Sequence, residues 1–128
     1  MNLSVAVLTL TAMAGGAGAA LRHLVDTTVA ARLGDHFPWG TTVVNISGSG
    51  TLGVLSAFAA GDQLAGATLT VVTAGLVGGY TTFSTTSVET VRLAMGGRHR
   101  AAAANAAVHL VACVAAAGFG FGFGRVWL

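Results

Sequence analysis

The sequence predicts an all-α integral membrane protein with four transmembrane helices, the third of which is broken in the middle of the membrane. Charged residues make up only 8% of the 128 residues, whereas a soluble domain has about one quarter. The few charges separate four uncharged stretches, each long enough to cross a bilayer. The third stretch is interrupted by two adjacent glycines and a cluster of hydroxyl residues. A single membrane domain that covers residues 1–128 fits this length.

The composition also argues against several functional classes. All six basic residues are arginines and form no patch interleaved with aromatic residues, so we expect no nucleic-acid partner. Cys113 is the only cysteine, which excludes an intrachain disulfide and a thiolate metal cluster. The four histidines lack metal-binding spacing, and no nucleophile or phosphate-loop motif occurs, so we expect no enzymatic activity.

The first predicted helix covers residues 2–25. Residues 1–21 carry no charge, and the first charged side chain is Arg22. The small residues that end this stretch also suit a signal-peptidase site, but a signal peptide needs a basic start and Met1–Ser4 has none. The polar segment Arg22–His36 is predicted to hold the end of this helix and an interfacial loop.

The second predicted helix covers residues 38–61. Pro38 suits the first turn of a helix, and Trp39 suits the depth of the lipid headgroups. Asn45 lies inside this uncharged stretch, where an amide is costly unless it meets a partner. Two interpretations of Asn45 stay open: a hydrogen bond to another helix, and a position beside an ion path.

The third predicted helix covers residues 63–95, with a break near residues 76–82. Gly78 and Gly79 weaken a helix there, and a break frees backbone groups that protein or a wet cavity must satisfy. One interpretation is a discontinuous helix whose break binds or passes a polar species. The other is a packing helix, with hydroxyls bonded to its own backbone. The hydroxyl residues are Thr81, Thr82, Ser84, Thr85, Thr86 and Ser87.

The fourth predicted helix covers residues 99–125. Asn105, His109 and Cys113 recur every four residues and therefore share one face of the helix. This face suits either a polar path or a contact with another helix, and the contact is the favoured interpretation.

The closing sequence GFGFGFG predicts a packing groove and a lipid-facing surface on the same helix. Gly118 and Gly122 form a GxxxG pair and are predicted to make the groove. Phe119 and Phe123 are predicted to face lipid.

The placement of the arginines predicts the orientation in the membrane. Four helices with short loops put both termini on one side. Five arginines fall on the opposite side, and only Arg125 shares the side of the termini. By the positive-inside rule, the first and third loops are cytoplasmic and both termini face out.

Three stretches, taken in order, carry a family resemblance. They read GGAGAALRH at Gly15–His23, GTTVVNISGSGTLG at Gly40–Gly53 and GLVGGYTTFSTTSVE at Gly75–Glu89. Together they resemble the small fluoride channels of the CrcB/Fluc family, and the resemblance covers nearly the whole chain. It implies a fluoride-selective passive channel in the plasma membrane of a prokaryote, which exports cytoplasmic fluoride and lowers its toxicity.

The resemblance also implies an antiparallel, dual-topology dimer with two pores and a structural sodium ion (Na+) at the dimer interface. The partners are then the fluoride ion, membrane lipid, and either a second copy of the chain or an oppositely oriented homologue. By motif position, the backbone carbonyls of Gly78 and Thr81 would bind the sodium. Arg22 would lie in the aqueous vestibule, and Glu89 matches the carboxylate that ends the signature.

The same carry-over assigns a fluoride pore. Asn45 would be the pore-lining amide, and Phe83 would be the pore aromatic, whose positive ring edge can face an anion. Ser84 and Thr85 carry hydroxyl groups that can donate hydrogen bonds to fluoride.

Two departures from the family pattern bear on this expectation. The signature TTFSTF reads TTFSTT here, so Thr86 stands on the predicted pore in place of a second phenylalanine. The arginine bias, five against one, favours a single orientation, whereas a homodimer of inverted copies needs both. We therefore hypothesise that the chain pairs with an oppositely biased homologue.

Two other functions stay open. A small dimeric multidrug or cation transporter shares four helices and dual topology, but it needs a membrane-embedded carboxylate in an early helix. No Asp or Glu precedes Asp26. The other function is a non-conducting partner subunit of a heterodimeric fluoride channel, to which Thr86 is the one feature that points.

Overall fold

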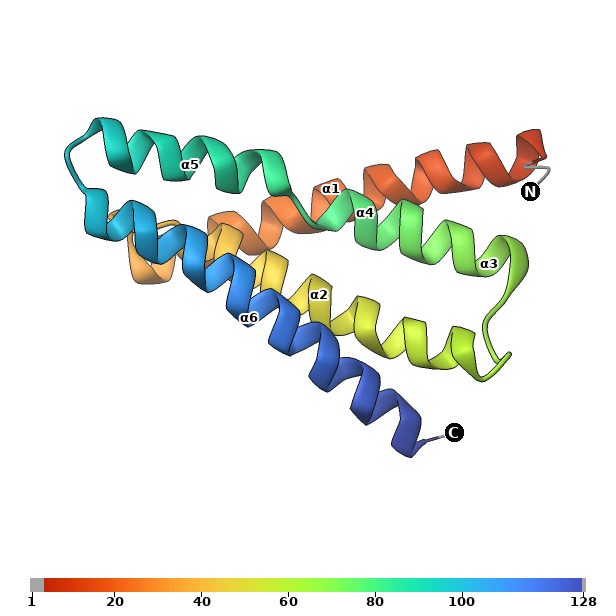
Figure 1. The fold of residues 1–128 in the computed structure, drawn as a ribbon. Helices are drawn as coiled ribbons and strands as arrows, with labels where there is room; N and C mark the ends of the chain where they lie inside the picture. Colours follow the sequence, from red (N-terminus) through yellow and green to blue (C-terminus); the bar gives the residue numbers. More distant parts are fainter. Residues whose placement is uncertain (1–3, 128) are drawn as a thin grey trace.

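The computed structural model describes residues 4–127, and this part of the chain is helical with no strand (Figure 1). Three helices are long and apolar enough to cross a membrane, by length and composition. They are α1 (Val5–Leu33), α2 (Trp39–Ala60) and α6 (His99–Val126). The segment between α2 and α6 is divided into shorter pieces: α3 (Gly66–Thr70), the π-helix η1 (Val71–Val77), α4 (Gly78–Tyr80) and α5 (Phe83–Met95).

Helix α1 is longer than its sequence predicted. It continues past residue 25, through Asp26 and Arg32, and ends at Leu33. The predicted end near residue 25 is therefore wrong, because charged residues can continue a helix beyond its apolar part and no glycine or proline occurs between residue 25 and Gly34. That glycine has a φ of +81°, a conformation that stops a helix and favours glycine.

The divided segment confirms a broken helix between α2 and α6. The break comes after Tyr80, where Thr81 (φ −78°, ψ 160°) and Thr82 (φ −152°, ψ 118°) are extended. Gly78 and Gly79 are themselves helical, so they do not make the break. A π-helix precedes it, and such wide turns are frequent near functional sites.

The glycines before the break serve close packing against α1. A Cβ on Gly79 would clash with the carbonyl of Gly15, and a Cβ on Gly75 would lie 2.8 Å from the carbonyl oxygen of Thr11. Gly18 of α1 is equally tight, because a Cβ there would lie 2.8 Å from the amide nitrogen of Tyr80. Small residues therefore let the two backbones touch, as in other membrane helix pairs.

Helix α6 packs along α2, but through a different glycine pair from the predicted one. A Cβ on Gly120 would clash with the carbonyl of Gly50, and a Cβ on Gly124 would lie 2.7 Å from the Cβ of Ala57. Nothing lies within 4 Å of a Cβ on Gly118 or Gly122. Within one chain, these two glycines therefore do not form the predicted packing groove.

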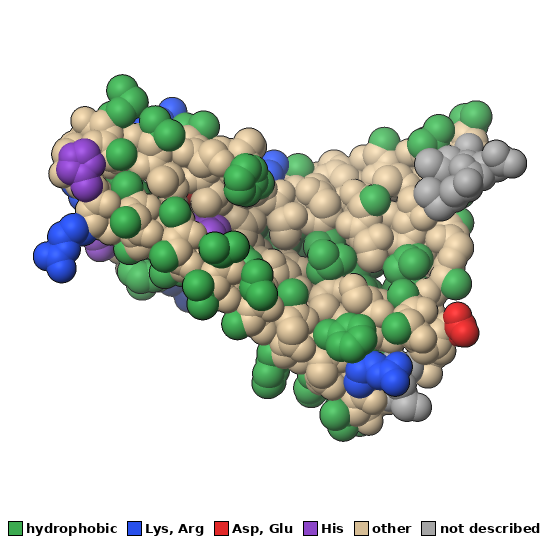
Figure 2. Space-filling model, viewed as in Figure 1, with side chains coloured by type: hydrophobic (Ala, Val, Ile, Leu, Met, Phe, Trp, Pro, Cys, Tyr) green, Lys and Arg blue, Asp and Glu red, His purple; other side chains and the backbone are tan. Residues whose placement is uncertain are grey.

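The start of α1 and the end of α6 lie at one end of the molecule, together with the α2–α3 connection (Figure 1). The loops before α2 and α6 meet at the opposite end, where the Arg98 guanidinium donates a hydrogen bond to the carbonyl of His36. The hydrophobic side chains are spread over the visible face of the molecule, and the few charged ones lie mostly toward its ends (Figure 2). An apolar surface of this kind suits lipid rather than water.

Candidate ion pathway at the helix break

Asn45 of α2 holds the break in the third segment. Its Nδ2 donates to the carbonyl of Thr82 at 2.8 Å and to the hydroxyl of Thr86 at 2.9 Å, and its Oδ1 accepts from the amide of Thr82 at 2.8 Å. Asn45 is 8% exposed. Buried backbone groups need hydrogen-bond partners. The break removes the helical partners of Thr82, and the Asn45 side chain bonds both its amide and its carbonyl instead. Both amide hydrogens of Asn45 are engaged within the chain.

Hydroxyl groups complete the turn that opens α5. The Oγ1 of Thr82 accepts a hydrogen bond from the amide of Thr85 at 3.2 Å and caps the helix. The same hydroxyl donates to the hydroxyl of Thr85 at 2.9 Å and lies 3.3 Å from that of Ser84. Thr86 accepts from Asn45 and donates to the carbonyl of Thr82 at 3.2 Å. The polar side chains at the break are therefore hydrogen-bonded to one another and to the backbone.

The carbonyls of Gly78 and Thr81 lose their helical donors at the break. In a continuous helix they would accept from the amides of residues 82 and 85. The amide of Thr82 instead donates to Asn45, and that of Thr85 to the Thr82 hydroxyl. Arg22 of α1 reaches the same place, where its guanidinium donates to the carbonyl of Thr81 at 3.4 Å.

Asn105 joins α6 to α5. Its Nδ2 donates to the hydroxyl of Thr90 at 2.9 Å and to the carbonyl of Thr86 at 3.5 Å, and the residue is completely buried. Asn105 thus makes the helix contact that was the favoured interpretation of its face. One and two turns further along, His109 and Cys113 line a hollow instead. The two interpretations of this face each hold for part of it.

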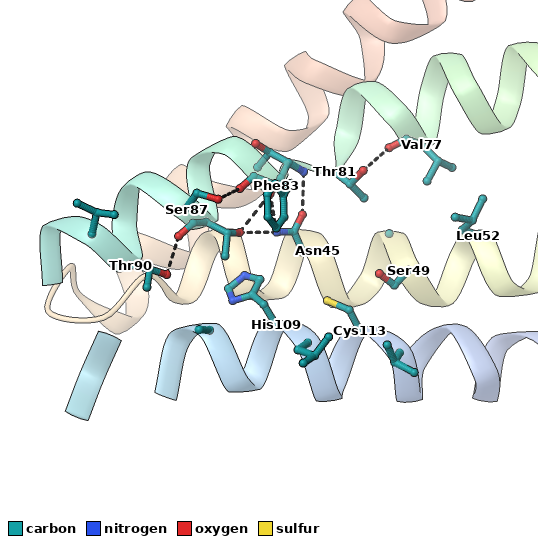
Figure 3. Close-up of a pocket in the computed structure, with 17 residues that line it drawn as sticks. Asn45, Ser49, Leu52, Val77, Thr81, Phe83, Ser87, Thr90, His109 and Cys113 are labelled. Carbon is teal, nitrogen blue, oxygen red and sulfur yellow. Dashed lines mark hydrogen bonds between the residues drawn. The ribbon is translucent and has the colours of Figure 1, made fainter. Parts of the chain in front are cut away.

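A groove of about 680 Å³ lies between α2, α5 and α6 (Figure 3). Its walls are mostly apolar, with a few polar groups at the level of the break. Residues from all three helices contribute, among them Asn45, Ser49, Phe83, Thr86, His109 and Cys113. Figure 3 shows His109 and Cys113 directed from α6 toward the other two helices. The arrangement can hold a small polar species between an apolar wall and a few hydrogen-bonding groups.

The structure brings most of the predicted pore residues to this groove. Asn45, Phe83 and Thr86 line it, and Thr86 is buried while Phe83 is 86% exposed, with its ring unpacked. Ser84 and Thr85 are not among its lining residues, and their side chains face the Thr82 hydroxyl.

Glu89 lies beside a second hollow of about 360 Å³, at the end where the first and third loops meet. The hydroxyl of Thr41 donates to its Oε1 at 2.8 Å, whereas its Oε2 is buried and has no hydrogen-bond partner in the described part of the chain. Thr90 and Val91 line the groove while Glu89 and Arg92 line the second hollow, so the two hollows are neighbours along α5.

Thr41 and the capping hydroxyl of Thr82 are site features that sequence reasoning did not single out. A signal for Thr41 was available, because it stands four residues before Asn45 and so shares its helix face. No comparable signal marks Thr82 among its hydroxyl neighbours. The backbone of Thr82 is held in its extended conformation by hydrogen bonds with Asn45, 37 residues away in the sequence.

Comparison with known proteins decides the family. The family model described as CrcB-like protein, Camphor Resistance (CrcB), matches residues 9–121. The chain belongs to the CrcB family. The match includes all three motifs and confirms the resemblance drawn from them.

Among the relatives of this CrcB chain are several bacterial proteins named as fluoride-specific ion channels. FluC 1 of Leifsonia xyli subsp. xyli is 40% identical over 113 residues, which cover 88% of this chain and 82% of the relative. FluC 1 of Rubrobacter xylanophilus is 46% identical, covering 78% of each chain. FluC 2 of Mycobacterium tuberculosis is 43% identical, covering 90% of this chain and 88% of the relative.

These relatives and the three long apolar helices agree with the predicted location. The CrcB chain is a multi-pass membrane protein of a prokaryote. The prediction that it is not an enzyme is confirmed by its membership of a family whose relatives are named as ion channels.

Proposed function

We propose that this CrcB chain is a subunit of a fluoride-selective passive ion channel that lets cytoplasmic fluoride leave the cell. The bacterial relatives named as fluoride-specific channels support this function. The structural observation that carries it is the helix break, which Asn45 holds beside a groove lined by an aromatic ring and hydroxyl groups. Irregular backbone at membrane depth is typical of sites that bind or pass ions.

The proposed path suits a small, strongly hydrated anion. Fluoride gives up water only where hydrogen-bond donors replace it. The hydroxyl groups of Thr86, Ser87 and Thr90 line the groove and donate to backbone carbonyls, so each would donate to fluoride by turning away from its carbonyl. Phe83 adds a ring whose positive edge can face the anion without holding it tightly. Because both amide hydrogens of Asn45 already bind Thr82 and Thr86, Asn45 fixes the shape of the path and reaches fluoride only by releasing the Thr86 hydroxyl.

Transport in this proposal is passive, because the membrane potential drives the anion. Neutral hydrogen fluoride crosses the lipid from acidic surroundings and dissociates in the cytoplasm. A membrane potential of 100 mV is worth about 2.3 kcal/mol per charge, so an inside-negative potential drives the anion outward. No coupled ion is needed, which separates this function from that of a small multidrug or cation transporter.

We further propose that four spans form, with the divided segment as the third, and that two chains assemble antiparallel. The unpacked ring of Phe83 and the open groove between α5 and α6 support a second subunit on this side. That subunit is either a second copy or an oppositely oriented homologue. The arginine bias supports the homologue, because a chain with a single preferred orientation cannot supply both halves of an inverted pair.

We also propose a sodium ion at the carbonyl groups of the break. Those of Gly78 and Thr81 lose their helical donors, and uncharged oxygen atoms are ligands that suit a hard cation. The Thr81 carbonyl accepts from Arg22 within this chain, so sodium would have to replace that guanidinium. In an antiparallel pair, two breaks that face each other would bring these carbonyls from both chains to one ion. The ion would fasten the breaks together and has no part in conduction.

A non-conducting partner subunit is the second candidate function. One observation favours it: Thr86 is buried against Asn45 as a hydrogen-bonding group, where the family signature carries a second aromatic ring. A pore that needs two rings would then be incomplete on this chain.

Passive ion efflux from liposomes that contain this chain distinguishes the two functions. Fluoride and chloride loss are followed with ion-selective electrodes after a potassium ionophore shorts the membrane potential. Rapid fluoride loss with chloride retained is the expected result, either from the chain alone or together with an oppositely biased homologue. Fluoride loss only when the homologue is present, and unchanged by substitution of Phe83 in this chain, supports the non-conducting role.

A further inference from the structure

His109 has a fixed orientation in the groove. Its Nδ1 lies 2.9 Å from the backbone carbonyl oxygen of Asn105. A carbonyl oxygen only accepts hydrogen bonds, so the proton of the neutral ring belongs on Nδ1. The other nitrogen, Nε2, is then a bare acceptor. It is buried and has no hydrogen-bond partner in the part of the chain that the structure describes.

The two protonation states of this ring act on an anion in opposite ways. In the neutral ring Nε2 carries a lone pair, and a lone pair repels an anion. In the protonated ring the same nitrogen carries an N–H donor, and the ring carries a positive charge beside the groove. Figure 3 shows the ring of His109 directed from α6 toward Asn45 and the start of α5.

We propose that His109 is a proton-dependent fluoride contact, which makes the groove bind the anion more tightly when the imidazole is protonated. The inference rests on the proposed channel function and adds a specificity-determining residue to it. His109 is placed on the path because it lines the groove. The hydrogen bond to the Asn105 carbonyl determines which ring nitrogen carries the proton in the neutral state.

The titratable and charged groups around His109 are few. Helix α2 has none between Trp39 and Ala60. Helix α5 carries Glu89 and Arg92, and Glu89 is close enough to interact electrostatically with His109. On α6, Cys113 follows one turn later on the same face. Glu89 is therefore the one other group whose protonation has to be separated from that of the imidazole.

Fluoride currents across planar bilayers test this inference, because a current reports the anion and is blind to neutral hydrogen fluoride. The half-saturating fluoride concentration is measured between about pH 8 and about pH 5.5, the range in which histidine titrates. For the natural chain we expect it to fall by about threefold to tenfold toward low pH, the ratio that separates a charge-assisted from a neutral hydrogen bond.

Four variants complete the design. His109→Gln keeps an N–H donor at every pH and His109→Leu has none, so both are expected to give a flat pH profile, with weaker fluoride binding for Leu. His23→Gln, on the exposed side of α1 away from the groove, is the matched control and is expected to keep the natural profile. Glu89→Gln is expected to keep a pH-dependent profile.

Three results would overturn the inference: a flat profile for the natural chain, a slope that survives in both His109 variants, or a slope that disappears in Glu89→Gln. If the His109 variants fail to fold, nitrogen NMR of the natural chain decides instead. The Nε2 signal must be that of an unprotonated nitrogen at high pH and must respond to fluoride at low pH. Absence of any fluoride current would overturn the proposed channel as well, whereas a pH-independent current overturns this inference alone.

Discussion

Asn45 and Thr86 occupy the centre of the network that fastens the helix break. The sequence predicted that Asn45 needs a partner at membrane depth, but its two open interpretations could not be separated without the fold. The structure assigns its amide to Thr82 and Thr86, which lie 37 and 41 residues away. Such long-range partners leave no periodic signal, and this is why the role of Thr82 was not predicted.

Thr86 tests the network at the scale of one hydroxyl group. Replacing it by valine keeps the shape but leaves an amide hydrogen of Asn45 without an acceptor in a buried place. We expect Thr86→Val to lower the free energy of unfolding by about 1–3 kcal/mol, whereas Thr86→Ser, which keeps the hydroxyl, stays close to the natural chain. Denaturant titration in detergent measures both. Equal stability of the two variants would show that the hydroxyl has no structural part.

The helices illustrate what sequence patterns determine and what packing determines. The lengths of α2 and α6 follow from uncharged runs, so they agree closely with the predicted 38–61 and 99–125. In GFGFGFG, by contrast, two glycine pairs share the same spacing on different sides of the helix, and no local feature says which side meets α2. The position of the break is also determined by packing. Gly79 stays helical and packs on α1, and the chain leaves the helix two residues later, at Thr81.

A matched pair of glycine substitutions tests the observed packing of α6. Gly120→Ala would push a methyl group into the carbonyl of Gly50 and separate α6 from α2. We expect it to cost about 1–3 kcal/mol of stability. Gly118→Ala meets open space, so stability should stay the same or rise by up to about 1 kcal/mol through better helix propensity. Thermal melting in detergent compares the two, and the opposite order would contradict this packing.

The arginines are distributed unevenly between the two ends of the molecule. The loops before α2 and α6 meet at one end, and the start of α1 and the end of α6 lie at the other. The number of chains in the functional unit could not be derived in the same way, because a partner leaves only indirect signs such as the unpacked ring of Phe83.

A reporter fused after residue 128 tests the orientation. Because four of the six arginines lie at the loop end and Arg22 reaches the break from the same half of α1, we expect a chain expressed alone to insert mainly with its termini outside. Alkaline phosphatase fused there should then be active, and a green fluorescent protein should stay dark. Equal populations of the two orientations would remove the reason for a separate, oppositely biased partner.

The reversal potential of the current under opposed fluoride and chloride gradients tests the central claim most directly. The chain is placed in a planar bilayer, together with an oppositely biased homologue if it needs one, and the pH is kept equal on both sides. The current should reverse at the equilibrium potential of fluoride and stay there when a sodium gradient is added. Reversal at the chloride potential, or a shift with the sodium gradient, would contradict a fluoride-selective passive channel.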